Sequence, residues 1–233
     1  LGARKRRAGE RAKRMRGGLA RSLVRKEWRL LARDPLLLSQ IMLQLLYLLP
    51  LFFIFGARLG EDALERFGVA AFAATFVLLS TSLAASLAWL TVSAEDAPDL
   101  IAAAPVASDE VSNAKAFAAG VPVVLLMLAP SFGAALISPP AGAWLFVGCA
   151  LSIASVCLMQ VWYQTPGSRK DFRRRKRGSF MVGFAQFFIT TGWTGSTAFA
   201  VSGWALASII PGLIALGVLL AMHESRPKTP AAA

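Results

Sequence analysis

The sequence predicts an all-α fold: a polytopic membrane protein with six transmembrane helices that follow an N-terminal amphipathic interfacial helix. Of the 233 residues, 56% are hydrophobic, the mean hydropathy is +0.56, and the charged residues gather in a few short stretches. Six uncharged runs separate those stretches, and each is long enough to cross a bilayer. The alternative, buried helical hairpins in a soluble protein, is disfavoured because soluble core helices rarely run this long without a charge.

The N-terminal part of the chain is strongly basic. Residues 1–18 are expected to form a basic cytoplasmic linker, and residues 19–34 an amphipathic helix with apolar residues on one face and arginines at four-residue steps on another. We expect Trp28 to lie at the level of the lipid head groups. The arginines expected to face lipid phosphates are Arg21, Arg25, Arg29 and Arg33. Pro35 ends this helix, because the residue before a proline disfavours the α conformation; a soluble basic helix is the alternative.

The six apolar runs form the predicted membrane domain, residues 35–222. They cover residues 35–57, 67–92, 116–137, 141–163, 179–202 and 203–222. A helix rises about 1.5 Å per residue, so roughly 20 residues cross the hydrocarbon core. The last two runs meet at Ser202 and Gly203, so their hairpin has to be tight, or one of them is only partly inserted. Gly192 and Ser196 form a pair of small residues that would let another helix approach closely.

The distribution of basic residues predicts the orientation. If six spans alternate, all but Arg58 and Arg66 of the 25 Lys and Arg residues fall on one side of the membrane. The positive-inside rule places that side in the cytoplasm, with both chain termini, the loops 93–115 and 164–178, and the tail 223–233. The sequence therefore predicts a protein of the cytoplasmic (plasma or inner) membrane.

The basic clusters next to the membrane are expected to contact anionic lipids. The densest of them, in loop 164–178, includes Arg173, Arg174 and Arg175. Juxtamembrane clusters of this kind commonly bind anionic head groups and fix topology. No nucleic-acid partner is expected, although the net charge of +12 would attract phosphates.

The loop 93–115 differs from its surroundings because it is acidic on a basic side and carries apolar residues on what is expected to be a wet surface. A short helix is expected after Asp99, ending before Pro105, and a second helix near Ser108 that leads into the third span. Apolar side chains on a wet surface are typical of a docking site. A helical hairpin packed on its own protein is the alternative. The expected contact residues are Glu95, Asp96, Asp99, Leu100, Ile101, Pro105 and Val106.

Residues that carry chemistry are scarce in the sequence. The predicted runs contain no ionisable residue, where proton-coupled carriers commonly place one. Cys149 and Cys157 would lie about 12 Å apart along one helix, which is too far for a disulfide. His223 is a poor base or metal ligand without partners. The sequence has no Gly-rich phosphate loop ending in Lys-Ser or Lys-Thr, so we expect no enzyme activity, catalytic residue, metal or cofactor in this chain.

The N-terminal half resembles the permease subunits of type II ABC exporters. The resemblance rests on Val-Arg-Lys-Glu-Trp-Arg-Leu-Leu-Ala-Arg-Asp-Pro-Leu at residues 24–36, then two spans, then an acidic loop that closes on Ala-Pro-Val and Lys115. It implies that segment 19–34 is the connecting helix and that segment 95–105 is the coupling element seated in a groove of a separate ATPase. It also implies a second six-span half, in the same chain or as a homodimer, and the Arg-rich start favours the C-terminal half of a longer chain.

We therefore expect the membrane-spanning component of an ATP-driven exporter of an apolar or amphiphilic substrate, with ATP bound on the partner subunit. A membrane scaffold or assembly protein that transports nothing is the main alternative. An ion-coupled carrier is a third.

Overall fold

The computed structural model describes residues 62–93, 108–163 and 180–226, together with single residues between 24 and 50. Every element in these ranges is a helix. The helices are α3 (Asp62–Ser93), α5 (Ser108–Ile137), α6 (Pro139–Tyr163), α7 (Phe180–Val201) and α8 (Ala205–Glu224). The start of α5 at Ser108 confirms the helix that was predicted to lead into the third span.

Four of the described helices are long and apolar enough to cross a membrane. These stretches are Gly68–Val92, Glu110–Ile137, Pro139–Tyr163 and Ala205–Glu224. They coincide with four of the six predicted runs and indicate a membrane-embedded protein. The run 179–202 forms α7, which is 22 residues long. Its threonines, its glycines and Gln186 lower its mean hydropathy, and it is not among these four helices. The run 35–57 lies almost wholly outside the described residues, so the prediction of six spans stays a prediction.

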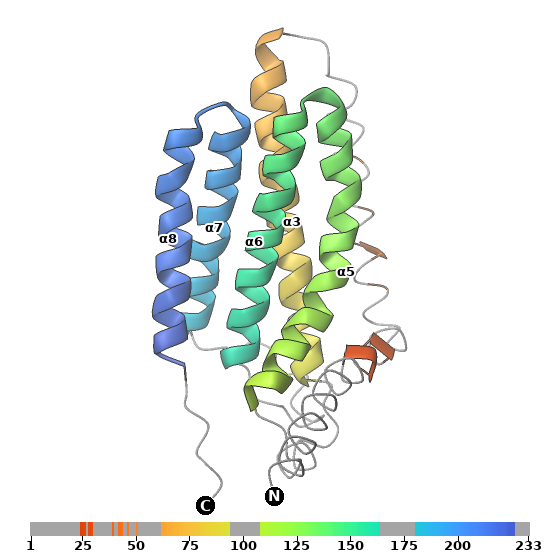
Figure 1. Cartoon of the computed structure of the whole chain (residues 1–233), viewed down its shortest axis with the longest axis vertical. Coiled ribbons are helices and arrows are strands. Elements are labelled where there is room, and N and C mark those ends of the chain that lie inside the picture. Colours follow the sequence, from red (N-terminus) through yellow and green to blue (C-terminus); the bar gives the residue numbers. More distant parts are fainter. Residues whose placement is uncertain are drawn as a thin grey trace, which may run out of the picture.

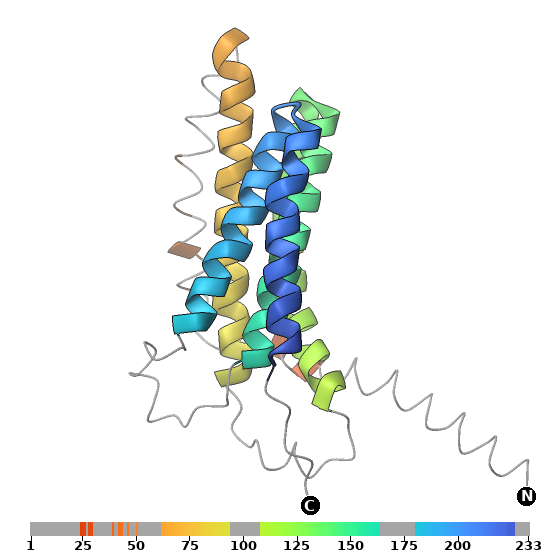
Figure 2. The ribbon, with the colours of Figure 1, turned by 90° about the vertical axis from the view of Figure 1, so that its left-hand side faces the viewer.

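The helices run up and down in an elongated bundle (Figures 1 and 2). In Figure 1, α3 and α6 lie in the middle, α5 on one side, and the hairpin of α7 and α8 on the other. The central helix is more buried than the outer one: 56% of the apolar stretch of α6 is buried, against 17% of that of α8. The core therefore sits where α6 meets α3, α5 and α7.

Two short turns join neighbouring helices at the end of the bundle opposite the last turn of α8. A single residue, Ser138, separates α5 from α6; its N–H donates to the Ala134 carbonyl at 2.9 Å, and its own carbonyl accepts from Gly142. Between α7 and α8 the chain reverses at Gly203, whose φ of 88° is readily adopted only by glycine. The predicted tight hairpin at Ser202 and Gly203 is confirmed.

Small residues set the helix-to-helix distances. A Cβ atom built on Gly148 of α6 would overlap the Thr197 side chain of α7. On α7, a Cβ on Gly192 would lie 2.7 Å from the Pro211 carbonyl oxygen and 2.8 Å from the Ala215 Cβ of α8. Close approach at Gly192 was predicted from the sequence and is confirmed. Dispersion and close packing hold helices together in lipid, where no hydrophobic force acts between them, so these contacts are structural.

The outward faces of the bundle are apolar. Among the described residues, Phe132 and Leu136 of α5, Phe187 of α7, and Leu206 and Ile210 of α8 are all more than 60% exposed. Patches of this extent on a water-soluble protein would promote association. These faces fit contact with lipid tails or with another apolar helix.

Replacement of Gly148 by alanine is expected to destabilise the bundle by about 1–3 kcal/mol, because the new methyl group needs the space of the Thr197 side chain. Gly183→Ala is the matched control on α7, since nothing lies within 4 Å of its Cβ position. Thermal unfolding in detergent measures both variants. Thr197→Ala, added to Gly148→Ala, should recover part of the loss, and equal melting temperatures for the two single variants would contradict this packing.

Candidate functional site

A polar seam, defined here as the hydrogen bonds that α6 makes with its neighbours, runs along the centre of the bundle. Its upper part joins α6 to two helices. The hydroxyls of Thr81 on α3 and Ser152 on α6 are hydrogen-bonded, and the indole Nε1 of Trp193 on α7 donates to Ser155 Oγ at 3.0 Å. Ser152 and Ser155 are three residues apart, so both lie on one face of α6.

The lower part of the seam joins α6 to α7 and α8. The amide Nε2 of Gln160 donates to Oε1 of Gln186 at 2.8 Å, which links α6 to α7. The hydroxyl of Tyr163 donates to the Met222 carbonyl at 2.7 Å and lies 2.8 Å from Ser225 Oγ. Unpaired polar groups are costly where water is absent, so these bonds fix the rotation and height of α6 relative to its neighbours.

Trp193 occupies a special place in the seam because it packs against both apolar clusters of the core. One cluster includes Leu145 and Ile153; the other includes Met159 and Ile189. Its ring therefore fills the space between the clusters while its N–H is held by Ser155. The two cysteines of α6, Cys149 and Cys157, are free and buried nearby, as the sequence predicted.

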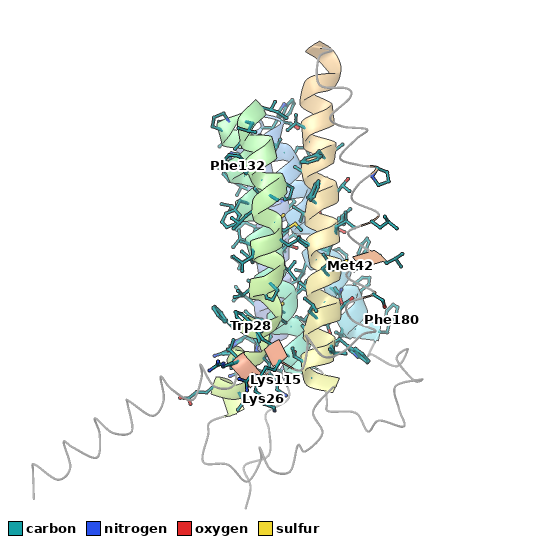
Figure 3. The ribbon with its side chains drawn as sticks, turned by 90° about the vertical axis from the view of Figure 1, so that its right-hand side faces the viewer. Lys26, Trp28, Met42, Lys115, Phe132 and Phe180 are labelled. Carbon is teal, nitrogen blue, oxygen red and sulfur yellow. The ribbon has the colours of Figure 1, made fainter. Side chains whose placement is uncertain are left out.

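A second polar contact lies at the end of the bundle where α5 begins. Here Trp28 Nε1 donates to the backbone carbonyl of Ala118 at 3.1 Å. Figure 3 shows Trp28, Lys26 and Lys115 together at this end. The described residues around Trp28, namely Val24, Arg25, Lys26 and Arg29, are helical, and the three basic side chains are exposed. We call this contact the basal junction.

Lys115 lies near the start of α5, directly before the predicted run 116–137, and it is only 8% exposed. The helix is 30 residues long, more than the roughly 20 residues that cross the hydrocarbon core. That no span contains an ionisable residue therefore stays a prediction. The position of Lys115 close to the end of the helix allows the aliphatic stem to be buried while the ammonium group remains near the membrane surface.

Aromatic side chains collect where α6 and α8 end. The rings of Trp162 and His223 meet edge to face with their centroids 4.9 Å apart, and Tyr163 follows directly. Aromatic residues are enriched at membrane–water interfaces, which fits the end of two spans. His223 therefore has an aromatic neighbour, and no metal-binding group of three or more His, Cys, Asp or Glu occurs in the described part of the chain.

Most of the predicted site residues lie outside the described residues. These are the whole coupling element, with Glu95, Asp96, Asp99, Leu100, Ile101, Pro105 and Val106, and the basic residues Arg21, Arg33, Arg173, Arg174 and Arg175. Arg25, Trp28 and Arg29 are described, and all three are helical and exposed. The predicted helix 19–34 is thus described at only a few positions, and its full extent stays a prediction.

Sequence reasoning missed both the seam and the basal junction. The seam has a weak signal, since Ser152, Ser155 and Gln160 are the polar residues in the second half of an otherwise apolar helix. The basal junction has a stronger signal in the sequence. Pro122 lies four residues after Ala118 and has no N–H to offer its carbonyl, so a partner from elsewhere was needed.

Ser155→Ala and Trp193→Phe should each weaken the bundle, and their effects should be non-additive. The expected coupling energy is about 0.6 kcal/mol and at most about 1.7 kcal/mol, the range found for hydrogen bonds between membrane helices. The unfolding free energies of both single variants and of the double variant, measured in mixed micelles, give this coupling energy. Trp144→Phe, at a 42% exposed position of α6, is the control. Strict additivity would show that the Trp193–Ser155 bond contributes nothing.

Comparison of the chain with protein-family models, curated proteins and solved structures finds no match.

Proposed function

We propose that this chain is the membrane-spanning permease component of an ATP-driven exporter of the ABC type, moved by a separate ATPase subunit that docks on segment 95–105. One observation carries the proposal. The last turn of α3 and the first turns of α5, which flank this acidic and apolar segment, lie at the same end of the bundle as Trp28 and its contact with α5 (Figures 1 and 3). A partner bound to the segment would thus act directly on two spans.

The charge distribution supports a cytoplasmic position for this end. Lys115, the basic residues around Trp28, and Arg226 after α8 all belong to it, and an ATPase needs cytosolic ATP. In the proposed topology six spans alternate, both termini are cytoplasmic, and the arginines of residues 19–34 and 173–175 bind anionic lipids. ATP binds to the partner, and this chain holds no cofactor of its own.

The substrate is proposed to be apolar or amphiphilic, such as a lipid or a hydrophobic compound. Many outward-facing side chains of α5, α7 and α8 are large and hydrophobic, which suits an apolar or amphiphilic molecule. The path would lie between this bundle and a second six-span half, from the same chain or a second copy. The exposed apolar faces of α5, α7 and α8 offer surfaces for that half.

A membrane scaffold that transports nothing is the second candidate. The polar seam favours it, because most of its side chains are hydrogen-bonded to one another within the bundle. A scaffold would show no dependence on nucleotide. An ion-coupled carrier, the third candidate, would require a proton or sodium gradient and no ATP.

Cysteine labelling tests the orientation. Asn113→Cys, exposed near the start of α5, should react with a membrane-impermeant maleimide only after the cells are permeabilised. Trp204→Cys, in the α7–α8 turn at a 68% exposed position, should react in intact cells. Background labelling should be low because Cys149 and Cys157 are buried. The reverse pattern would put segment 95–105 outside the cell and exclude a cytosolic motor.

Co-purification tests the docking site. The intact protein is expected to retain an ABC-type ATPase. The triple variant Leu100→Ser, Ile101→Ser and Val106→Ser should weaken that association at least about tenfold, because it removes apolar surface from the contact. Glu224→Gln, at the same end of the bundle on α8, is the control and should leave the association unchanged. Unaltered binding of the triple variant would remove segment 95–105 from the interface.

A further inference from the structure

Pro122 leaves a gap in the hydrogen-bond ladder of α5. In a regular helix the carbonyl of Ala118 would accept from the N–H of residue 122, but proline has none, and its ring also crowds the preceding turn. A buried carbonyl without a donor is unfavourable in lipid, and a helix often bends at such a point. In Figures 1 and 2 the first turns of α5 lean away from the axis of its upper part.

The indole of Trp28 supplies the missing donor. Its Nε1 donates to the Ala118 carbonyl at 3.1 Å, across 90 residues of sequence, and Ala118 is fully buried. Trp28 itself is 42% exposed, so its ring remains at the surface of the bundle while its N–H reaches the helix backbone. The freed carbonyl and the donor thus match in both chemistry and position.

We infer that Trp28 is a latch that ties the N-terminal basic helix to a proline hinge in α5, so that the two segments move together. From the hinge towards its N-terminus, α5 continues to its start at Ser108, three residues after the end of segment 95–105 in the sequence. The latch therefore connects the N-terminal helix with the first turns of α5, which the proposed ATPase contact would move. Its role as a transmission contact rests on the proposed function, whereas the latch itself does not.

Distances between spin labels at Arg29→Cys and Asn113→Cys, both exposed positions, report whether the latch is closed. The measurement uses the full chain in vesicles of phosphatidylethanolamine and phosphatidylglycerol, without ATPase. Trp28→Phe keeps an aromatic ring but removes the donor. The ratio of the released population, with the longer label-to-label distance, to the latched population should therefore rise roughly three- to tenfold. Trp204→Phe, an exposed tryptophan at the opposite end, is the matched control and should change nothing.

Pro122→Ala makes the test specific to the hinge. It restores an N–H for the Ala118 carbonyl, so Trp28→Phe no longer leaves that oxygen unpaired. In the Pro122→Ala background, Trp28→Phe should therefore shift the ratio less than about twofold. Equal shifts in both backgrounds, or no shift with Pro122 present, would overturn the latch.

A second measurement, in the complex with the ATPase, tests transmission. Trp28→Phe should lower substrate transport while ATP hydrolysis continues, because the motor still turns over but moves α5 less. A proportional fall of transport and hydrolysis would point to failed assembly and would overturn the transmission role. If the unaltered protein shows no ATP-driven transport, the proposed function fails, while the distance measurements still decide the latch.

Discussion

The bundle depends on how closely α6 approaches its neighbours. Helices in lipid gain little from apolar burial, because lipid tails are as apolar as leucine, and their association rests on close packing and hydrogen bonds. The chain meets this constraint with Gly148 against Thr197, with the hydroxyl pair of Thr81 and Ser152, and with the Trp193 indole on Ser155. These contacts fix α6 relative to α3 and α7. Short turns join α5 to α6 and α8 to α7, and so restrict where these two helices can lie.

A rigid centre and a less regular periphery follow from this arrangement. The seam pairs the polar groups of α6 inside the bundle, so rotation of α6 would break several bonds at once. In α5, by contrast, Pro122 and Pro130 each remove one backbone hydrogen bond, and only 28% of its apolar stretch is buried. A force applied at the basic end should therefore bend α5 before it disturbs α6.

The sequence predicted the helices well because hydropathy and length decide whether a segment can span lipid. The run 141–163 became α6 within two residues, and the turn at Gly203 followed from the lack of any spacer. The hydrogen bonds between helices could not be predicted, because the pattern of serine and threonine in an apolar run is the same whether they bond their own helix or another. The burial of Lys115 was not predicted, because charge alone was weighed, without the length of its aliphatic stem. The Trp28–Ala118 bond joins positions 90 residues apart, a pairing that no local pattern carries.

ATP-dependent movement of an amphiphile across the membrane tests the central claim most directly. The intact protein would be reconstituted with the proposed ATPase subunit, and a fluorescent lipid analogue would be followed from one leaflet to the other. We predict transfer that requires hydrolysable ATP and stops when segment 95–105 is deleted. Transfer that needs no ATP and follows a proton gradient, or no transfer by an assembled complex, would contradict the account.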